Sequence, residues 1–456
     1  ISVSLKAQKL RLLRSSYKSN SYVGDLYSHS CNFVGMKTSF IEELQWRRML
    51  HDMTPGVEAF LSSGQKKAYI GFDPTANSLG VGNLVQVMML VHFQRAGHTP
   101  VALLGGATGM IGDPSFKSEE RKLLSKNILK ENLKAQKSQL KKLLGESIII
   151  LDNYDWYKNF NFLDFIRDVG KHITVNYMLA KDSVKSRQDS GISFTEFSYQ
   201  LIQAFDFHFL SKNKDIFLQM GGSDQWGNIT TGIDLNRRMG GKNSFALTTP
   251  LIKKGDGSKF GKTEGENIWL DANKTSPYKF YQFWLNSSDE DASNYIRIFT
   301  TKTKSEIENI ESLHTETPQL RVLQKDLAFD ITKRVHSNEA ANNAIKASEI
   351  LFGKGTKEML KQLSTVELLE IFSGVPMINI PREKLNSGIT ALDLITQSKG
   401  FFKSRGEAKN LIIAGAVSIN KSKISIDKMI SLDDFLKNKY VVIQKGKKNY
   451  ALAILE

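Results

Sequence analysis

Hydrophobic and polar positions alternate along the first half of the chain in a way that predicts strands and helices in turn. Short apolar runs predict four buried strands, at 66–72, 101–104, 147–151 and 216–220. Between them, 84–96 and 122–144 have helical character and end at Gly97 and Gly145. Apolar strands separated by helices indicate a parallel sheet covered on both faces. The pattern therefore predicts an open α/β domain.

The second half of the chain has a different pattern. Residues 278–352 are helical in character, with few glycines and many charges, and 353–388 has the composition of a connection. The last block, 389–456, mixes two short helices with alternating strands at 416–419 and 440–444. The predicted order is α/β domain, helical domain, linker and small α+β domain, with bounds 36–276, 277–352, 353–388 and 389–456.

Residues 1–35 differ in composition from the rest of the chain. They carry five basic residues, one acid (Asp25) and many serines. We interpret them as an extension outside the fold, with Met36 as the start and a cytoplasmic location. The alternative is a transit peptide, which is rich in Arg and Ser and poor in acids, and which would place the protein in a mitochondrion or another organelle.

Composition narrows the function classes. The net charge of the 456 residues is +15, and 389–456 alone contains 12 basic and 6 acidic residues, so a polyanionic partner is a reasonable expectation. The one cysteine, Cys31, excludes an internal disulfide and a zinc ribbon, and no H-x-x-x-H pair supports a histidine metal site. No apolar stretch approaches the 18 residues that a membrane-spanning helix needs.

Glycine-rich segments follow the predicted strands, at the sheet edge where ligands of α/β proteins bind. These segments are GFDPT with LGVGN at 71–83, GGATGMIGDP at 105–114, GGSDQWGN at 221–228 and GDGSKFGKT at 255–263. Glycines before a helix allow phosphate oxygens to approach backbone N–H groups. Lys259 and Lys262 could close over a polyphosphate. Neither the dinucleotide fingerprint nor a Walker A loop is complete, which argues against a generic nucleotide site.

One predicted helix, 194–206, carries polar side chains on an otherwise apolar face. Tyr199, Gln203 and Asp206 are spaced i, i+4 and i+7 and therefore share that face. Burying a phenol, an amide and a carboxylate is costly unless polar partners lie opposite. The pattern suits a pocket that binds a hydroxyl and an ammonium group, although partners within the protein would also satisfy it.

Together, GFDPT, GGATGMIGDPS, FTEFSYQLIQAFDF, GGSDQWGN and KFGKT, in this order, closely resemble the bacterial-type tyrosyl-tRNA synthetases, a group of class I aminoacyl-tRNA synthetases. The similarity extends over 36–456. It implies a Rossmann-like catalytic domain, a helical anticodon-binding domain and an S4-like RNA-binding domain, whose pattern is matched by 404–417 with Asn420. The implied reaction activates L-tyrosine with ATP and transfers it to tRNA(Tyr).

The resemblance also implies roles for individual residues. Tyr69 and Asp206 would bind the phenolic hydroxyl of tyrosine. The full tyrosine-binding set is Tyr69, Asp113, Tyr199, Gln203, Asp206 and Gln225. The ATP-binding set is Asp73, Gly80, Gly82, Asn83, Gly222, Asp224 and Lys262. The catalytic set, which would stabilise the departing pyrophosphate, is Thr75, Lys117, Arg121, Lys259, Lys262 and Thr263. ATP would arrive with Mg²⁺ as a substrate, with no resident metal or prosthetic group, and relatives form homodimers through the segment around Phe194.

Three positions depart from the pattern of the resembling family. The usual His-x-Gly-His reads Gly80-Val81-Gly82-Asn83 here, Phe116 replaces a glycine, and Ile70 replaces a polar group that some relatives offer to the ribose. These changes predict a slower first step. The rival hypothesis is an RNA-binding protein with a synthetase fold and little catalysis, and tyrosine-dependent pyrophosphate exchange would separate the two.

Overall fold

The protein is described by a computed structural model. The described residues are 39–115, 123–146, 148–185, 191–255, 257, 260–263, 266–352, 356–372, 375–397, 401–446 and 449–456. The expected extension at 1–35 and the expected start at Met36 lie outside them. No helix within these ranges is long and apolar enough to cross a membrane.

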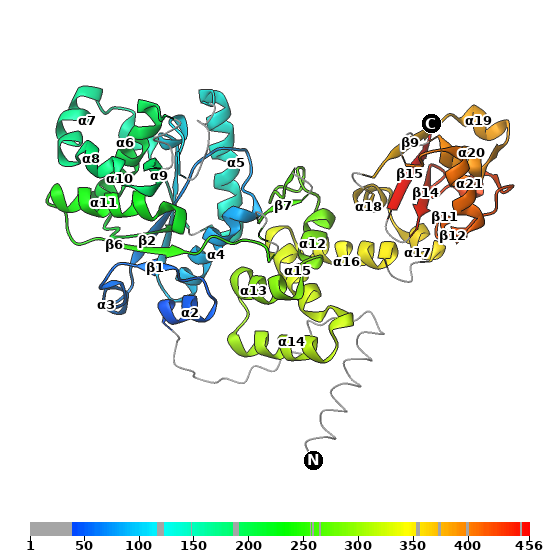
Figure 1. Cartoon of the computed structure of the whole chain (residues 1–456), viewed down its shortest axis with the longest axis horizontal. Coiled ribbons are helices and arrows are strands. Elements are labelled where there is room, and N and C mark those ends of the chain that lie inside the picture. The colour runs from blue at the N-terminus through cyan, green and yellow to red at the C-terminus, as the bar shows by residue number, and fades with distance from the viewer. Residues whose placement is uncertain are drawn as a thin grey trace, which may run out of the picture. The chain divides into compact units, whose positions relative to one another are not determined.

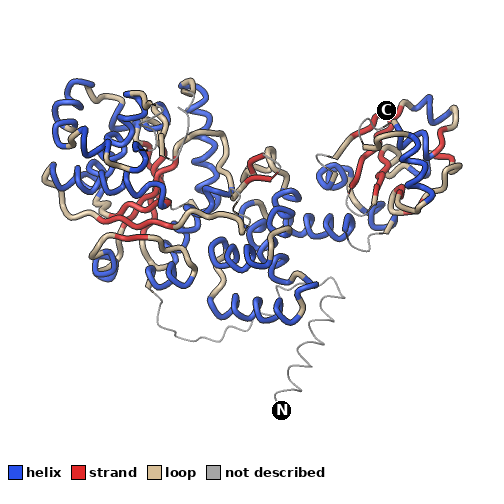
Figure 2. Tube along the Cα trace, in the orientation of Figure 1, coloured by secondary structure: helices blue, strands red, loops and turns tan. Residues whose placement is uncertain are grey.

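A six-stranded sheet forms the centre of the first domain (Figures 1 and 2). The strand order is β1-β6-β5-β2-β3-β4, and only β1 runs antiparallel to its neighbour. The strands are β1 Asp52–Met53, β2 Lys67–Phe72, β3 Thr99–Leu104, β4 Ile149–Asp152, β5 Leu218–Gly222 and β6 Phe245–Thr249. The predicted parallel α/β sheet is therefore confirmed.

The side chains of β2 alternate between two buried cores, which shows that helices cover both faces of this sheet. Ala68, Ile70 and Phe72 belong to the core that contains α4, whereas Tyr69 belongs to a second core with Phe207 of α10. Successive strand residues point to opposite faces, so the two cores must lie on opposite sides. The long helices are α4 Val81–Arg95, α5 Lys126–Leu144, α10 Phe194–Lys214 and α11 Trp226–Arg238. The shorter ones are α2 Phe40–Trp46, α3 Val57–Ser62, α6 Tyr154–Tyr157, α7 Phe162–Asp168, α8 Val175–Leu179 and α9 Asp182–Lys185.

The sheet topology determines where a ligand can bind. The chain runs from β2 outward to β3 and β4, and then returns to β5 on the other side of β2. Loops leaving the carboxyl ends of β2 and β5 therefore diverge and leave a crevice, which is where open α/β sheets bind ligands. Phe72 and Gly222 are the last residues of these two strands.

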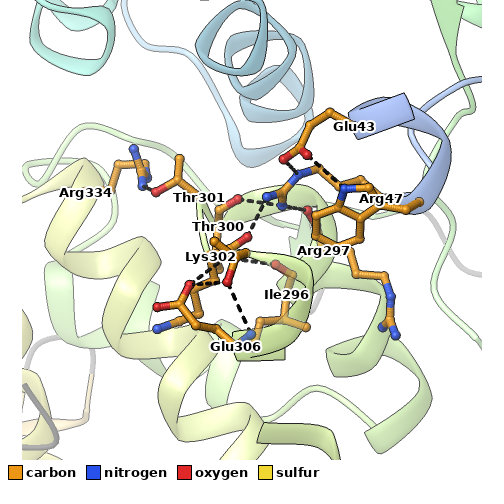
Figure 3. Close-up of polar contacts among 11 residues, drawn as sticks. Glu43, Arg47, Ile296, Arg297, Thr300, Thr301, Lys302, Glu306 and Arg334 are labelled. Atoms are coloured by element: carbon orange, nitrogen blue, oxygen red, sulfur yellow. Dashed lines mark hydrogen bonds and ion pairs between the residues drawn. The ribbon is translucent and has the colours of Figure 1, made fainter. Parts of the chain in front are cut away.

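Five helices follow the sheet and confirm the predicted helical part. They are α12 Pro277–Leu285, α13 Asp289–Phe299, α14 Lys304–Glu316, α15 Val322–Val335 and α16 Asn338–Phe352. Arg47, directly after α2, is fully buried and joins these helices to the sheet domain. Its guanidinium donates to the carbonyl oxygens of Arg297 (2.5 Å), Thr300 (2.9 Å) and Lys302 (2.6 Å), and its Nε donates to Glu43 (2.7 Å). Figure 3 shows this guanidinium reaching the end of α13.

Replacing Arg47 should destabilise the protein strongly. Arg47→Ala would leave the buried carbonyl of Thr300 without its donor and would remove the charged donor of Glu43, which would keep only Trp46 Nε1. Removing one partner of such a buried network costs on the order of 3 kcal/mol in the free energy of unfolding. Denaturant unfolding measures this loss. Arg48→Ala removes the same charge from the exposed neighbouring position and should change the stability little.

The C-terminal part contains a five-stranded sheet of order β12-β11-β14-β15-β9. Its strands are β9 Met377–Ile380, β11 Val417–Ile419, β12 Ser422–Lys423, β14 Tyr440–Lys445 and β15 Asn449–Leu455. The helices α20 Ala391–Thr396 and α21 Arg405–Ile413 pack on it, as the sequence predicted. A small pair, β10 Ile389–Thr390 with β13 Met429–Ile430, completes this part.

The prediction of a bare linker over 353–388 is wrong. This segment forms α17 Lys357–Gln362, α18 Thr365–Ile371 and α19 Arg382–Asn386 in addition to β9. Strand β9 pairs in parallel with β15, so it is an edge strand of the C-terminal sheet. Leu360 and Leu368 share a buried core with Val442 and Leu452 of the same sheet. The short apolar run of β9 has no strong signal of its own, because its stability comes from a partner strand more than 70 residues later.

Candidate active site

Asp73, the residue after β2, lies at the centre of a hydrogen-bonded group. The Tyr199 hydroxyl of α10 donates to its Oδ2 (2.9 Å), and the Thr108 hydroxyl donates to its Oδ1 (2.7 Å). Gly105 after β3 makes this approach possible, since a Cβ there would lie 2.1 Å from Asp73 Oδ1. The paired strands β2 and β3 thus bring GFDPT and GGATG together, and the helix α10 contributes its polar face.

Asp206 is the buried carboxylate of the site. It is 1% exposed, and it accepts hydrogen bonds from Asn153 Nδ2 (3.0 Å) and Trp156 Nε1 (2.9 Å). Burial raises the pKa of Asp206 to about 7, although the two donors act in the opposite direction. A carboxylate held in this way has a fixed orientation and remains able to accept a further hydrogen bond.

Tyr69 of β2 faces the same side of the sheet as Asp206. Its ring packs edge-on against Phe207, with 5.5 Å between the ring centres. Its side chain is 1% exposed, and its hydroxyl meets no hydrogen-bond partner among the described residues. Burial, together with the charge of Asp206, raises the pKa of Tyr69 well above its ordinary value. A neutral, buried phenol without a partner is costly, which is the condition expected of a group that binds a ligand.

A second polar group lies near the end of β5. Gln225 Nε2 donates to Asp113 Oδ2 (2.8 Å) and to Asp224 Oδ2 (3.2 Å), and Gln203 Nε2 approaches Gln225 Oε1 at 3.5 Å. Asp113 also accepts from the backbone N–H of Ser115 (3.0 Å). The structure therefore brings all six of the predicted tyrosine-binding residues to one side of the sheet.

The N-terminus of α4 differs from the expectation. The Gly80 N–H donates to Asn83 Oδ1 (3.1 Å), and the Val81 N–H donates to the carbonyl of Ile268 (3.0 Å). These two N–H groups are therefore already engaged within the protein, whereas the glycines of this segment had suggested N–H groups open to phosphate oxygens. The cause is the strand-like segment at Ile268–Trp269, which pairs with Gly80 and which the local sequence did not reveal.

Gly261, in the middle of the KFGKT motif, lies directly against this helix terminus. Gly261 has a φ of +86°, and a Cβ there would lie 3.0 Å from Val81 Cγ2. Glycine is therefore required by both conformation and space. The backbone of Lys262 and Thr263 forms β7 (Lys262–Thr263), paired with β8 (Glu266–Asn267). Their side chains, and the predicted residues Lys117, Arg121 and Lys259, lie outside the described part. So does Phe116.

The remaining predicted residues border the crevice. Thr75 is exposed and lies with Asp73 and Gly109 on the wall of a hollow that continues to Leu123 and Leu124 before α5. Gly222 allows Asp224 to approach, since a Cβ at Gly222 would lie 2.4 Å from Asp224 Oδ1. Gly82 and Asn83 are exposed in the first turn of α4.

Three residues that support the site were not predicted. Asn153 and Trp156 hold Asp206, and Thr108 links Asp73 to Asn153 through a hydrogen bond of 3.1 Å from Asn153 Nδ2. The only signal available in the sequence was the position of Asn153 at the carboxyl end of the strand ending at Asp152. Its role depends on a contact with a helix 53 residues away, which no local pattern encodes.

Comparison with known proteins agrees with this architecture. The model of the family described as tRNA synthetases class I (W and Y) matches residues 62–353. The model of the tyrosine–tRNA ligase SYY-like C-terminal domain matches residues 367–453. The fold and the crevice at the switch point are therefore those of a class I aminoacyl-tRNA synthetase.

Individual relatives show to which family within this class of synthetases the chain is similar. A tyrosine–tRNA ligase of Cytophaga hutchinsonii is 56% identical over 421 residues, which cover 91% of this chain and 99% of the relative. One from Porphyromonas gingivalis is 54% identical over 92% of this chain and 100% of the relative. A truncated mitochondrial tyrosyl-tRNA synthetase of Aspergillus nidulans has a TM-score of 0.62 and 30% identity, covering 67% of this chain and 92% of that structure. The chain belongs to the tyrosine–tRNA ligase family, and the resemblance seen in its motifs is confirmed.

Proposed function

We propose that this chain activates L-tyrosine with Mg²⁺-bound ATP and transfers the tyrosyl group to tRNA(Tyr). The observation that carries the proposal is the pair formed by Tyr69 and Asp206, in which a buried phenol that has no hydrogen-bond partner among the described residues lies beside a buried, oriented carboxylate. The hydroxyl of a substrate tyrosine would accept from Tyr69 and donate to Asp206. Phenylalanine would leave both groups unpaired, which is the costly case.

The other polar residues suit the two ends of the amino acid. Asp113, Tyr199 and Gln203 would bind the ammonium group, and Gln225 would lie beside the carboxylate. In the ligand-free arrangement Tyr199 donates to Asp73 and Gln225 donates to Asp113, so bound substrate would replace or share these contacts. The pre-existing hydrogen bonds support a preorganised site, which lowers the cost of ordering it on binding.

ATP would bind between the switch point and α4. Asp73, Gly222 and Asp224 would contact the adenosine, and the first turn of α4, with Gly80, Gly82 and Asn83, would face the phosphates. Thr75, Lys117, Arg121, Lys259, Lys262 and Thr263 would stabilise the charge of the leaving group. The passage of Gly261 over Val81 supports this assignment, because it brings the lysine-bearing loop to the phosphate end of the crevice.

The proposed chemistry has two steps. A carboxylate oxygen of tyrosine attacks the α-phosphorus of ATP, and the bond from that phosphorus to the oxygen bridging to the β-phosphate breaks, so pyrophosphate leaves. A hydroxyl of the 3′-terminal ribose of tRNA then attacks the tyrosyl carbonyl, and AMP leaves. Neither step needs a covalent enzyme intermediate, since positioning and charge stabilisation lower both barriers.

Tyrosine-dependent exchange of pyrophosphate into ATP tests the first step, and charging of tRNA(Tyr) transcript tests the second. We expect both activities. Binding of the transcript without any exchange would favour the rival, an RNA-binding protein with a synthetase fold.

We also propose that the helical part, 277–352, contacts the anticodon arm and that the C-terminal sheet domain binds tRNA. Lys409 of α21 and Lys423 of β12 are exposed and support the second assignment. Asn420, although it matches the S4-like pattern, is buried and holds the backbone at Asp434 and Val442. Its role in this proposal is to shape the domain, without contact to RNA.

We further propose a homodimer formed through an apolar surface on α7, α8 and the start of α10. The exposed fractions are 66% for Phe162, 72% for Leu163, 59% for Val175 and 67% for Phe194. The three helices share one buried core on their inner side, so their outer sides belong to one region of the domain. Large apolar side chains exposed in one region of a domain are typical of an interface in soluble proteins.

Leu163→Asp should convert the dimer into monomers. A carboxylate on this surface would have to lose its hydration on association, whereas the side chain of Leu163, 72% exposed, contributes little to the stability of the single chain. Sedimentation velocity measures the mass of the species. Val366→Asp, at a 65% exposed position on α18, is the matched control and should leave the mass unchanged.

A further inference from the structure

Helix α5 carries a stripe of lysines along one side. The stripe consists of Lys126, Lys130, Lys134, Lys137 and Lys141. At 100° per residue these five positions fall within about 80° of the helix circumference, and they extend over about 22 Å of its length. The first four are exposed, and the side chain of Lys141 is 38% exposed. The buried positions of the helix are centred on an adjacent side, roughly 100° away, and the exposure of the lysines shows that the stripe faces solvent.

The lysine stripe lowers the stability of the helix that carries it. Neighbours three or four positions apart carry the same charge, which destabilises a helix, and the first turn holds Lys126 without any acidic residue. Within the described part of the chain, only Lys141 of the five has a recorded ion pair, with Glu146 (2.7 Å). A surface serving only solubility would intersperse charges of both signs. The arrangement therefore points to a partner that supplies the negative charge.

The position of α5 indicates what that partner is. Its inner side holds the loop after β2, because Asn132 Nδ2 donates to the carbonyl of Pro74 (2.8 Å) and Gln136 Nε2 donates to that of Ala76 (3.0 Å). Leu123 and Leu124, immediately before the helix, line the same hollow as Asp73 and Thr75. The N-terminal end of α5, where the stripe begins, therefore lies beside this hollow.

We propose that the lysine stripe of α5 binds the phosphate backbone of the tRNA arm whose 3′ end enters the crevice. The proposal rests on the proposed tRNA-charging function and adds a binding surface to it. A row of regularly spaced ammonium groups suits consecutive phosphates, contacts of this kind position an RNA without reading its sequence, and each of them makes the affinity depend on salt. Because the inner side of the same helix holds the loop of Asp73 and Thr75, the bound arm would be aligned with the reacting groups.

The test compares the triple variant Lys130→Gln, Lys134→Gln, Lys137→Gln with Lys142→Gln. Glutamine keeps the helix propensity and removes like-charge repulsion, so the triple variant should fold at least as stably as the parent. Lys142 is an exposed lysine of the same helix outside the stripe, and its charge contributes to the low pKa of His336, so it faces the helical part. It is therefore the matched control.

Binding of tRNA(Tyr) transcript is measured at several salt concentrations, with tyrosine-dependent pyrophosphate exchange measured in parallel. We expect the triple variant to bind about tenfold or more weakly, with the slope of log affinity against log salt reduced by about 3. Pyrophosphate exchange by the triple variant should be unchanged. The Lys142→Gln variant should show the same dependence of affinity on salt as the parent protein. An unchanged slope in the triple variant overturns the proposal, while normal exchange and charging would leave the proposed function intact. Loss of binding to anionic vesicles or heparin with tRNA binding unaffected would also overturn it.

Discussion

Asp206→Ala is expected to reduce tyrosine activation by about 10- to 150-fold, because a hydrogen bond to a charged group is worth roughly 1.5–3 kcal/mol. The substitution removes the acceptor for the substrate hydroxyl from a site where water cannot replace it, since Asp206 is 1% exposed. It also leaves Trp156 Nε1 without its acceptor and removes one of the two acceptors of Asn153 Nδ2. Pyrophosphate exchange with tyrosine and with phenylalanine measures the effect.

Selectivity is the decisive readout for this variant. The preference for tyrosine over phenylalanine should collapse, whereas the affinity for ATP should remain. A variant that folds, binds ATP and retains full selectivity would refute the assignment of the pocket. Circular dichroism distinguishes this outcome from unfolding.

The same residue predicts a pH dependence. The pKa of Asp206 in the empty pocket is about 7, above its ordinary value of 3.8. The buried carboxylate therefore costs stability as the pH rises from about 4 to 7. A bound phenol donates to the ionised form, so tyrosine affinity should fall as the pH drops below about 7, by up to about tenfold per unit. Phenylalanine, which cannot donate, serves as the control.

Gly80→His is expected to increase the rate of tyrosyl-adenylate formation by about 10- to 100-fold while tyrosine affinity stays nearly constant. A donor aimed at the phosphates acts mainly in the transition state, and the loss of one such donor typically costs about 10²–10³ in rate. The expected gain is smaller because Thr75 and the lysines of the loop also stabilise the negative charge that develops on the phosphates. The backbone of Gly80 is extended, with a φ of −99°, so a side chain is allowed there.

Gly80→Ala is the matched control for this substitution. Any Cβ at this position would lie 3.3 Å from the carbonyl oxygen of Ile268, so the segment must shift by a few tenths of an ångström. Alanine introduces that contact without the imidazole and should not increase the rate. Pre-steady-state measurement of rate and of tyrosine affinity separates the two effects. An unchanged rate with histidine would mean that this site does not use a donor at position 80, where the N–H groups of Gly80 and Val81 are already engaged.

Local patterns were enough for the α/β domain and for the polar face of the helix that borders its crevice. Apolar runs separated by helices can pair only as a covered parallel sheet, and the loops at its carboxyl edge must then share one crevice. The spacing of Tyr199, Gln203 and Asp206 required a common helix face, and α10 has it. Long, specific motifs such as FTEFSYQLIQAFDF made the family recognisable.

Contacts between distant segments were decided only by the tertiary structure. The support of Asp206 by Asn153 and Trp156 joins the end of one strand to a helix, and the engagement of the Val81 N–H depends on Ile268. Strand β9 exists because β15 offers it a partner. Periodicity records which face of an element is buried, but it does not record which element covers that face. Hydrogen bonds across long sequence separations therefore had to be seen in the folded chain.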